Sequence, residues 1–466
     1  MQTVNNRKVM PKITRKIELL FDRSGLSEEE CKEKWRFIYQ INDNLYRVAN
    51  RLVNQLYLAD EIDDILRLSD QEYIALRKKL ANKKLDEATR ISLEEQMSQV
   101  MKRVNERRSA ILQRPQQSFA YSVVTDSDTE GLTAKILDVL KQDVLSHYKA
   151  DTKEVLKGEK SISNYKKGMP IPFAFNDSLR LYKEDGFFYL KWYNGIRFLL
   201  NFGRDASNNQ LIVERCLGIS KDEISYKTCS SSIQIKKKGN HSKIFLLLVV
   251  DVPVEQYAQK PNMVVGVDLG LNVPIYAASN STLERKAIGS REAFLNQRGA
   301  FQRRFRALQR LQTTKGGRGR LHKLEPLERV REAERNWVRT QNHLFSREVI
   351  NFAIDVGAST IQMEKLANFG RDAQGEVRED KKYVLRNWSY FELQNLIEYK
   401  AKRAGIKVKY INPAFTSQTC SECGQLGERD SIHFKCTNPD CPNCGKDIHA
   451  DYNGARNIAK SKDYIK

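Results

Sequence analysis

Five of the eight cysteines lie between Cys420 and Cys444, and this cluster constrains the fold more than any other feature of the sequence. Two motifs in this segment have the form Cys-x-x-Cys-Gly, one ending at Gly424 and one at Gly445. Paired motifs of this kind suit one Zn²⁺ ion held by four thiolates in a tetrahedron. Because protein sulfurs would fill all four positions, the ion would stabilise the fold and leave no position for a reacting water.

Three carboxylates stand where a buried strand or a helix is expected to end or begin. Asp268 ends the apolar run Val-Val-Gly-Val, Glu364 ends Thr-Ile-Gln-Met, and Asp451 opens the last predicted helix. A buried acid is costly to desolvate unless it is paired or holds a cation. Brought to one sheet edge, the three would form an oxygen site for Mg²⁺ or Mn²⁺. Two ions about 3.5–4 Å apart would activate a water for phosphodiester cleavage.

The charge balance indicates a polyanionic partner. Lysine and arginine outnumber aspartate and glutamate by 79 to 58, which gives a net charge of +21 at pH 7. Nucleic acid explains such a charge better than an anionic membrane does. No run of about 18 apolar residues is present to span a bilayer. The first residues lack the apolar core of a secretory signal, so we expect a cytoplasmic, nucleoid-associated protein.

The chain has 466 residues, of which 40% are hydrophobic, so we expect a multidomain α+β protein with real cores. Alternating apolar residues from Ile13 to Phe21 predict a strand, and Ser27 followed by three glutamates predicts a helix start. Amphipathic helices are expected up to about residue 155. The alternating strands that follow predict a small antiparallel barrel or sheet, which the first strand would join.

Strands and helices alternate in the second half of the chain. Met263 to Val267 is predicted as a strand with Val273 to Ala278 as its hairpin partner, and Arg285 to Gly357 as a long basic helical region. The remaining predicted elements are a strand at Thr360 to Met363, a helix from about Trp388 to Ala404, a strand at Lys407 to Ile411 and a helix at Asp451 to Lys460.

Three of these segments resemble the split RuvC nuclease of TnpB-type transposon nucleases and of the type V CRISPR effectors. They are Gly266 to Gly270, Gln362 to Leu366 and Ala450 to Ile458. Ser417 to Gly424 resembles the zinc ribbon that those proteins carry before the third acid. The similarity in specific motifs covers about residues 262 to 466. Before residue 262 the resemblance rests only on the order of predicted elements, which is a strand, a helical lobe and a barrel. Among type V effectors, the short chain and early helical lobe look most like the miniature type V-F group.

The resemblance implies an RNA-guided DNA endonuclease with an RNase H-like (RuvC) nuclease domain. Asp268, Glu364 and Asp451 would be its catalytic and metal-binding residues. Its partners would be a guide RNA and target double-stranded DNA, recognised beside a short, T-rich motif. The implied domains are a wedge barrel (1–27 and 156–260), a recognition lobe (28–155), the nuclease domain (261–414 and 449–466) and a zinc ribbon that binds target nucleic acid (415–448).

The resemblance leaves the zinc ligands and the oligomeric state open. The family's second cysteine pair usually follows a Phe-x-Cys strand directly, which here ends at Cys436, so this chain carries an insertion. The geometry of the Cys-x-x-Cys-Gly motif, called a zinc knuckle, favours Cys441 as the third ligand, with Cys436 as the alternative. The predicted set is Cys420, Cys423, Cys441 and Cys444.

Type V-F proteins work as homodimers around one guide RNA and TnpB-type proteins as monomers, and the sequence does not choose between them.

A stretch between Glu292 and Glu325 carries bases and no acid. A solvated helix face usually mixes both signs, so we predict contact with a nucleic-acid backbone, which sets affinity rather than sequence choice. The predicted contacts are Arg298, Arg303, Arg304, Arg306, Arg310, Lys315, Arg318, Arg320 and Lys323. A polar loop from Asn368 to Arg386 is predicted as a lid beside Glu364, in which Arg386 would stabilise the developing phosphate charge.

Three alternatives compete with this interpretation. The first is a TnpB-type transposon nuclease. The second is a guide-dependent DNA-binding protein that does not cleave, against which the intact trio of acids argues. The third is a junction-resolving nuclease that needs no RNA, although such an enzyme would not need so large a helical lobe.

Overall fold

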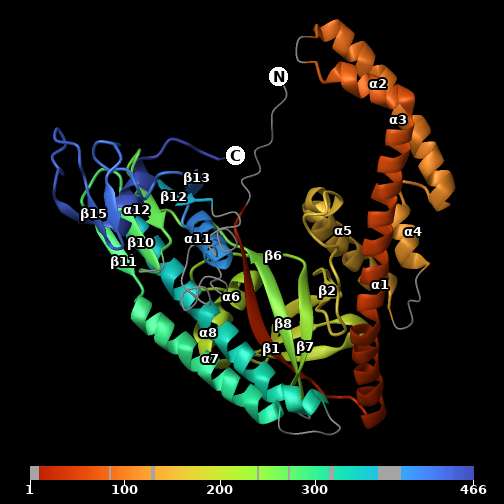
Figure 1. Cartoon of the computed structure of the whole chain (residues 1–466). Helices are drawn as coiled ribbons and strands as arrows, with labels where there is room; N and C mark the ends of the chain where they lie inside the picture. The colour runs from red at the N-terminus through yellow and green to blue at the C-terminus, as the bar shows by residue number, and fades with distance from the viewer. Residues whose placement is uncertain are drawn as a thin grey trace. The chain divides into compact units, whose positions relative to one another are not determined.

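The computed structural model of the chain is shown in Figure 1. It describes residues 10–82, 85–126, 132–238, 241–270, 273–313, 320–365 and 390–465. The described residues form two compact units, one spanning Lys12–Val252 and one that begins at Pro253. None of the helices in the described ranges has a stretch that is long and apolar enough to cross a membrane.

The first unit is built on an eight-stranded antiparallel sheet with the order β2-β7-β8-β1-β5-β4-β3, and β6 pairs with β8. Its strands are β1 (Lys12–Phe21), β2 (Ile171–Phe173), β3 (Arg180–Glu184), β4 (Phe187–Lys191), β5 (Arg197–Asn201), β6 (Lys227–Thr228), β7 (Ser231–Lys238) and β8 (His241–Asp251). The first strand lies between β8 and β5, so its predicted pairing with much later strands is confirmed. Closure of this sheet into a barrel stays a prediction.

Helices make up the rest of the first unit. They are α1 (Glu28–Ser69), α2 (Gln71–Leu80), α3 (Glu87–Leu112), α4 (Phe119–Thr125), α5 (Ala134–Leu156) and α6 (Ala206–Leu217). As predicted, α1 begins after Ser27, whose hydroxyl accepts from the Glu30 N–H while the Glu30 carboxylate accepts from the Ser27 N–H. This reciprocal cap satisfies two amide groups that the helix leaves open. Helix α6 was not predicted, because it is short and sits among strand signals.

The second unit contains a five-stranded mixed sheet with the order β11-β10-β9-β12-β13. Its strands are β9 (Val264–Asp268), β10 (Ile275–Ser279), β11 (Arg285–Ile288), β12 (Thr360–Glu364) and β13 (Lys407–Ile411). The pairs β11–β10 and β10–β9 are antiparallel, whereas β12 is parallel to both β9 and β13. The predicted helix start at Arg285 is therefore wrong: residues 285–288 form a strand, whose alternation is hidden in the sequence by Arg285 and Lys286.

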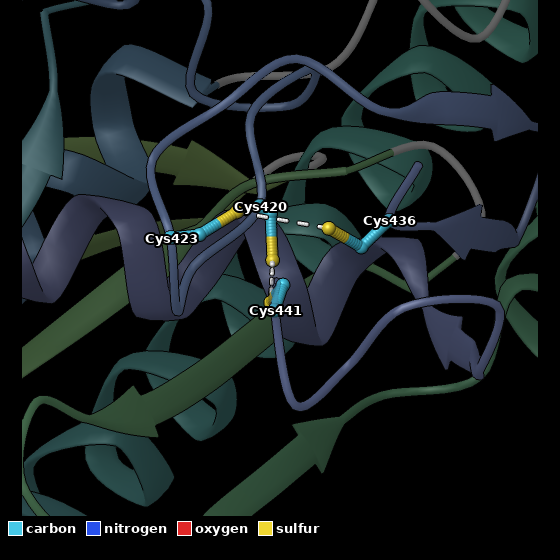
Figure 2. Close-up of side chains that lie close together, drawn as sticks. All are labelled: Cys420, Cys423, Cys436 and Cys441. Carbon is cyan, nitrogen blue, oxygen red and sulfur yellow. Dashed lines mark hydrogen bonds between the residues drawn. The ribbon is translucent and has the colours of Figure 1, made fainter. Parts of the chain in front are cut away.

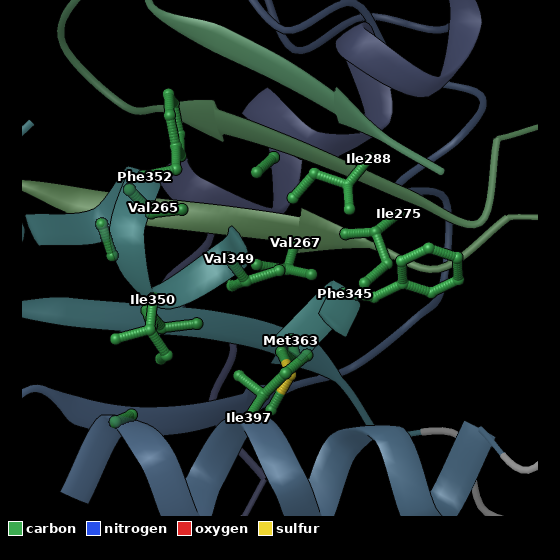
Figure 3. Close-up of a cluster of buried hydrophobic side chains, with 14 of the residues drawn as sticks. Val265, Val267, Ile275, Ile288, Phe345, Val349, Ile350, Phe352, Met363 and Ile397 are labelled. Atoms are coloured by element: carbon green, nitrogen blue, oxygen red, sulfur yellow. The ribbon is translucent and has the colours of Figure 1, made fainter. Parts of the chain in front are cut away.

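Helices cover both faces of this sheet. They are α8 (Arg320–Asp355), α11 (Tyr390–Arg403) and α12 (Ala450–Lys460), whereas α7 (Arg291–Thr313) packs mainly against α8. Side chains of α8 and α11, such as Val349 and Ile397, pack with Val267 and Met363 of the sheet in one buried core (Figure 3). On the other face, Tyr276 of β10 and other residues pack against α12. Both faces of β9 are thus buried, which explains its continuous apolar run.

Helix α12 lies unusually close to the central strand β9. A Cβ atom added to Gly266 would lie 2.0 Å from the carbonyl oxygen of Ala455 and 2.4 Å from the backbone nitrogen of Ala459. Only glycine at position 266 allows this approach. A small three-stranded sheet precedes α12, with the order β14 (Glu428–Asp430), β15 (His433–Lys435) and β16 (Asp447–His449). Strand β16 runs directly into α12, so this sheet and the helix are positioned together.

Candidate active site and metal centre

Asp268 and Glu364 lie on neighbouring parallel strands. Met363 pairs with Val267, so the two acids that follow these residues stand side by side at the carboxyl ends of β12 and β9. Helix α12 brings the third acid to the same place: a Cβ atom at Gly454 would lie 2.9 Å from Asp268 Oδ2. A Cβ atom at Gly270, two residues after Asp268, would lie 3.8 Å from Asp451 Oδ2. Three segments far apart in sequence thus meet at one sheet edge.

Burial and mutual repulsion make this cluster a poor place for uncompensated negative charge. The pKa of Asp268 is raised well above its ordinary value, first by burial and then by the charges of Glu364 and Asp451. Burial also raises the pKa values of Glu364 and Asp451. Asp451 Oδ2 is buried and takes no hydrogen bond from any described residue. An orphaned oxygen among three buried acids fits a bound cation, which would remove the repulsion.

Arg429, which was not among the predicted site residues, places a positive charge beside the acids. Its guanidinium Nη2 lies 3.3 Å from Asp451 Oδ1, and its charge lowers the pKa values of Asp268 and Glu364 as well. Arg429 belongs to β14 and lies between Glu428 and Asp430. Because an acid stands on each side of it, no run of positive charge in the sequence marks it as a site residue. Only the folding of the small sheet against α12 brings it to the acids.

A loop before the cysteines holds Glu364 from the other side. The Thr416 hydroxyl lies 2.5 Å from Glu364 Oε1, and the Gln394 side-chain amide donates to the Glu364 carbonyl at 2.8 Å. The side-chain nitrogen of Asn457 on α12 donates to the Thr416 carbonyl at 2.8 Å. Asn453, one turn earlier, donates to the Thr419 carbonyl at 2.7 Å. The spacing of four residues puts both asparagines on one helix face, a signal that the sequence contains.

Four sulfur atoms form the second cluster (Figure 2). The Sγ atoms of Cys420 and Cys441 are 3.8 Å apart, those of Cys423 and Cys436 are 3.6 Å apart, and all four lie within 4.8 Å of one another. Within the described residues, this is the one group of three or more potential ligands with that spacing, so the carboxylates lie farther apart. Four thiolates in this arrangement can hold a tetrahedral metal ion such as zinc.

The ligand set differs from the predicted one at one position. Cys436 and Cys441 both enter the cluster, whereas Cys444, which was predicted as the fourth ligand, is exposed and outside it. Cys436 follows β15 directly, and its carbonyl accepts from the Gly445 N–H at 3.0 Å. This contact holds the chain in a turn that points Cys441 inward. The N–H of Asn443 lies 3.4 Å from the Cys441 sulfur.

The basic stretch divides into a buried and an exposed part. Arg298 is only 3% exposed and lies 3.0 Å from Glu334 of α8, so its predicted contact with nucleic acid is wrong: it joins two helices. Arg303, Arg304, Arg306 and Arg310 are exposed on α7. Lys315, Arg318 and Arg386 lie outside the described residues, as do the side chains of Arg320 and Lys323 and the predicted lid.

Comparison with known proteins places the chain in a family. The model of the Cas12f1-like TNB domain matches residues 390–458. The CRISPR-associated endodeoxyribonuclease Cas12f1 of Sulfoacidibacillus thermotolerans is 32% identical over 354 residues, which cover 73% of this chain and 80% of the relative. The chain belongs to the Cas12f1 family.

Cas12f1 proteins are also similar to this chain in fold. The solved Cas12f1–sgRNA–target DNA complex contains a chain that superposes with a TM-score of 0.60 at 20% identity, covering 97% of this chain and 99% of that one. A TnpB-like protein of Methanocaldococcus jannaschii is 34% identical over 113 residues, which cover 24% of this chain and 40% of that protein. The resemblance to the type V-F group and to TnpB is confirmed, and the likeness to Cas12f1 extends over more of the chain.

Proposed function

We propose that the chain is an RNA-guided DNA endonuclease whose active site is formed by Asp268, Glu364 and Asp451. The convergence of these three acids at one edge of an RNase H-like sheet carries the proposal, because the ion pair between Arg429 and Asp451 does not by itself balance three buried carboxylates. Family membership supports it, since the Sulfoacidibacillus relative is named as an endodeoxyribonuclease. The related complex contains an sgRNA and target DNA, which we propose as the partner classes here.

The acid site suits Mg²⁺ or Mn²⁺, because these ions prefer carboxylate oxygens and Asp451 Oδ2 has no other partner in the described chain. Two such ions, when bound, would lower the pKa of a water and offset the charge that develops at the phosphodiester. The chain's own groups set the geometry. Thr416 and Gln394 orient Glu364 from two sides, and Gly266 lets α12 carry Asp451 to the sheet.

Arg429 would stabilise the developing phosphate charge, a role also predicted for Arg386, which lies outside the described residues. The Arg429 guanidinium can bridge from Asp451 to a phosphate oxygen, and a planar guanidinium suits such contacts. Fixed positive charge beside a reacting phosphate stabilises the transition state more than the ground state. Arg429 would therefore act on the reaction rate.

The cysteine cluster would hold one structural zinc ion through Cys420, Cys423, Cys436 and Cys441. All four positions are filled by sulfur, so the ion would not bind water. Its effect on catalysis would be indirect: it stabilises the ribbon that carries Arg429 and the loop that carries Thr416.

Further parts of the proposal concern recognition. The sheet of the first unit would form the wedge barrel, and α1 to α5 the recognition lobe, which together hold the guide RNA and read a T-rich motif in duplex DNA. Exposed arginines of α7, such as Arg303, would contact the nucleic-acid backbone. The protein would act on DNA of the nucleoid, with a homodimer around one guide RNA as the expected assembly.

The test is a cleavage assay on the purified RNA complex. Asp268→Ala is expected to abolish cutting of a guide-matched duplex in Mg²⁺ while guide and target binding stay close to wild type. A wild-type complex that binds the matched target and nicks it in no divalent metal would favour the non-cleaving alternative. Cutting without any bound RNA would favour a junction-type nuclease.

A further inference from the structure

The loop that orients Glu364 also presents an aromatic ring to solvent. Phe415 is 62% exposed and directly precedes Thr416, whose hydroxyl contacts the Glu364 carboxylate. Adjacent Cα atoms are about 3.8 Å apart, so the ring starts one residue away from the acid site. Thr416, by contrast, is buried.

The backbone of Phe415 is held in a conformation that suits glycine better. Its φ angle is 63°, in the left-handed region that bulky residues rarely adopt. Its carbonyl accepts from the N–H groups of Gln418 and Thr419, at 3.0 and 3.1 Å, and the Asn412 side chain accepts from the Ala414 N–H at 3.1 Å. Packing within the described chain covers only the smaller part of Phe415, although its loop is strained and firmly bonded.

A shallow cavity of about 490 Å³, open to solvent, lies beside this ring. Polar groups from the end of α12 and the following tail line it, including Lys460, Ser461 and Asp463. Lys460 is anchored at the edge by donating to the Ser421 carbonyl at 2.7 Å. Thr416 lines the same cavity and contacts Glu364, so the cavity and the acid site share one wall.

We propose that Phe415 stacks on a nucleobase of the DNA strand that lies at the acids, beside the phosphate to be cut. This inference rests on the proposed function and adds a positioning residue to it. In this arrangement, a strand whose phosphate lies at Glu364 would pass the loop at Thr416, and its neighbouring base would meet the exposed ring of Phe415. Aromatic stacking accepts every base, so the contact would position the strand without adding sequence preference.

The experiment measures single-turnover cleavage of a guide-matched target in Mg²⁺ by wild type, Phe415→Ala and Phe415→Tyr. Each protein is tested on the intact target and on targets with one abasic nucleotide at either side of the mapped cut. We expect Phe415→Ala to slow cutting of the intact target about 5- to 100-fold, as loss of one stacked base does elsewhere. One abasic position should slow wild type similarly and slow Phe415→Ala no further. Phe415→Tyr should restore the rate.

A folding control comes from the backbone. Phe415→Gly removes the ring and fits the positive φ angle, so its thermal midpoint should be at least that of wild type while cleavage is as slow as for Phe415→Ala. If Phe415→Ala is slower than wild type by the same factor on the abasic targets as on the intact target, or cuts the intact target at the wild-type rate, the stacking proposal alone is overturned. A wild-type complex that does not cut the intact target overturns the proposed function, and the stacking proposal with it.

Discussion

Arg429 of the small ribbon sheet lies 3.3 Å from Asp451 of α12, measured from Nη2 to Oδ1. The pair joins the element that carries the cysteines to the element that carries the third acid. Arg429 also lowers the pKa values of the other two acids, so it acts on the whole cluster. The ribbon therefore does more than support the fold: it supplies the positive side chain of the candidate active site.

Replacing Arg429 with alanine should slow cleavage about 100-fold or more, the usual cost of removing one preorganised transition-state donor. Lysine at this position should restore part of the rate, because it keeps the charge and loses the planar fork. The measurement is single-turnover cleavage at saturating Mg²⁺. Lys435→Ala, an exposed base on the neighbouring strand β15, is the matched control and should cut normally. Equal rates for the two alanine variants would remove Arg429 from the active site.

Asp268→Asn should stabilise the metal-free protein at neutral pH. The folded-state pKa of Asp268 is raised, so the folded chain binds this proton more tightly than the unfolded chain does. Stability that the protonated acid contributes is complete below about pH 4 and is lost as pH rises through the raised pKa. Calorimetry in EDTA should show that, as pH rises, the melting temperature of Asp268→Asn falls less than that of wild type. Added Mg²⁺ should stabilise wild type and have little effect on Asp268→Asn.

Cys436 and Cys444, by which the observed sulfur cluster differs from the predicted ligand set, should behave in opposite ways. Cys436→Ser should lose the bound zinc, because Cys436 belongs to the sulfur cluster, whereas Cys444→Ser should keep one zinc per chain. Elemental analysis of the purified proteins measures the metal directly. Chelation of the zinc should slow cleavage through the loss of ordered Arg429 and Thr416. Zinc retained in Cys436→Ser and lost in Cys444→Ser would restore the ligand set expected from the knuckle motifs.

Gly266→Ala should destabilise the nuclease unit by about 3 kcal/mol or more, the upper end of the cost of overpacking. Its new Cβ would meet backbone atoms of α12, which cannot move as a side chain can. Gly299→Ala in α7 is the matched control, because its Cβ would approach only the Arg303 side chain, at 3.3 Å. Alanine there should stabilise the helix by about 0.5–1 kcal/mol. Chemical denaturation of both variants measures the difference, and equal effects would contradict the close packing of α12 on β9.

Arg298 and Arg303 should separate stability from nucleic-acid binding. Arg298→Ala removes the ion pair between a buried guanidinium and Glu334 and should cost about 3–5 kcal/mol of stability, with no change in the salt dependence of binding. Arg303→Ala should leave stability unchanged. It should also reduce the slope of the logarithm of the binding constant against the logarithm of salt concentration by about one. Target binding measured over a salt series distinguishes the two, and a reduced slope for Arg298→Ala would contradict its buried role.

Local sequence patterns were sufficient for most elements that carry the candidate site. Apolar runs ending in Asp268 and Glu364 located β9 and β12, and the strand predicted at Lys407 to Ile411 matches β13. The prediction failed at Arg285 to Ile288, where charged residues on the exposed side conceal a strand. Patterns of this kind work when one face of an element is buried and fail when charge obscures that face.

The sequence by itself determined which side chains are available: acids at the ends of apolar runs, thiols in pairs and arginines along a helix. Only the tertiary structure decided which of them meet. It brought Cys436 into the sulfur cluster and left Cys444 outside, buried Arg298 against Glu334, and placed Arg429 beside Asp451. The physical reason is that ligation and ion pairing depend on distances of a few ångströms between distant segments. The packing of α12 on β9 and of the ribbon on α12 sets those distances, and no local pattern encodes them.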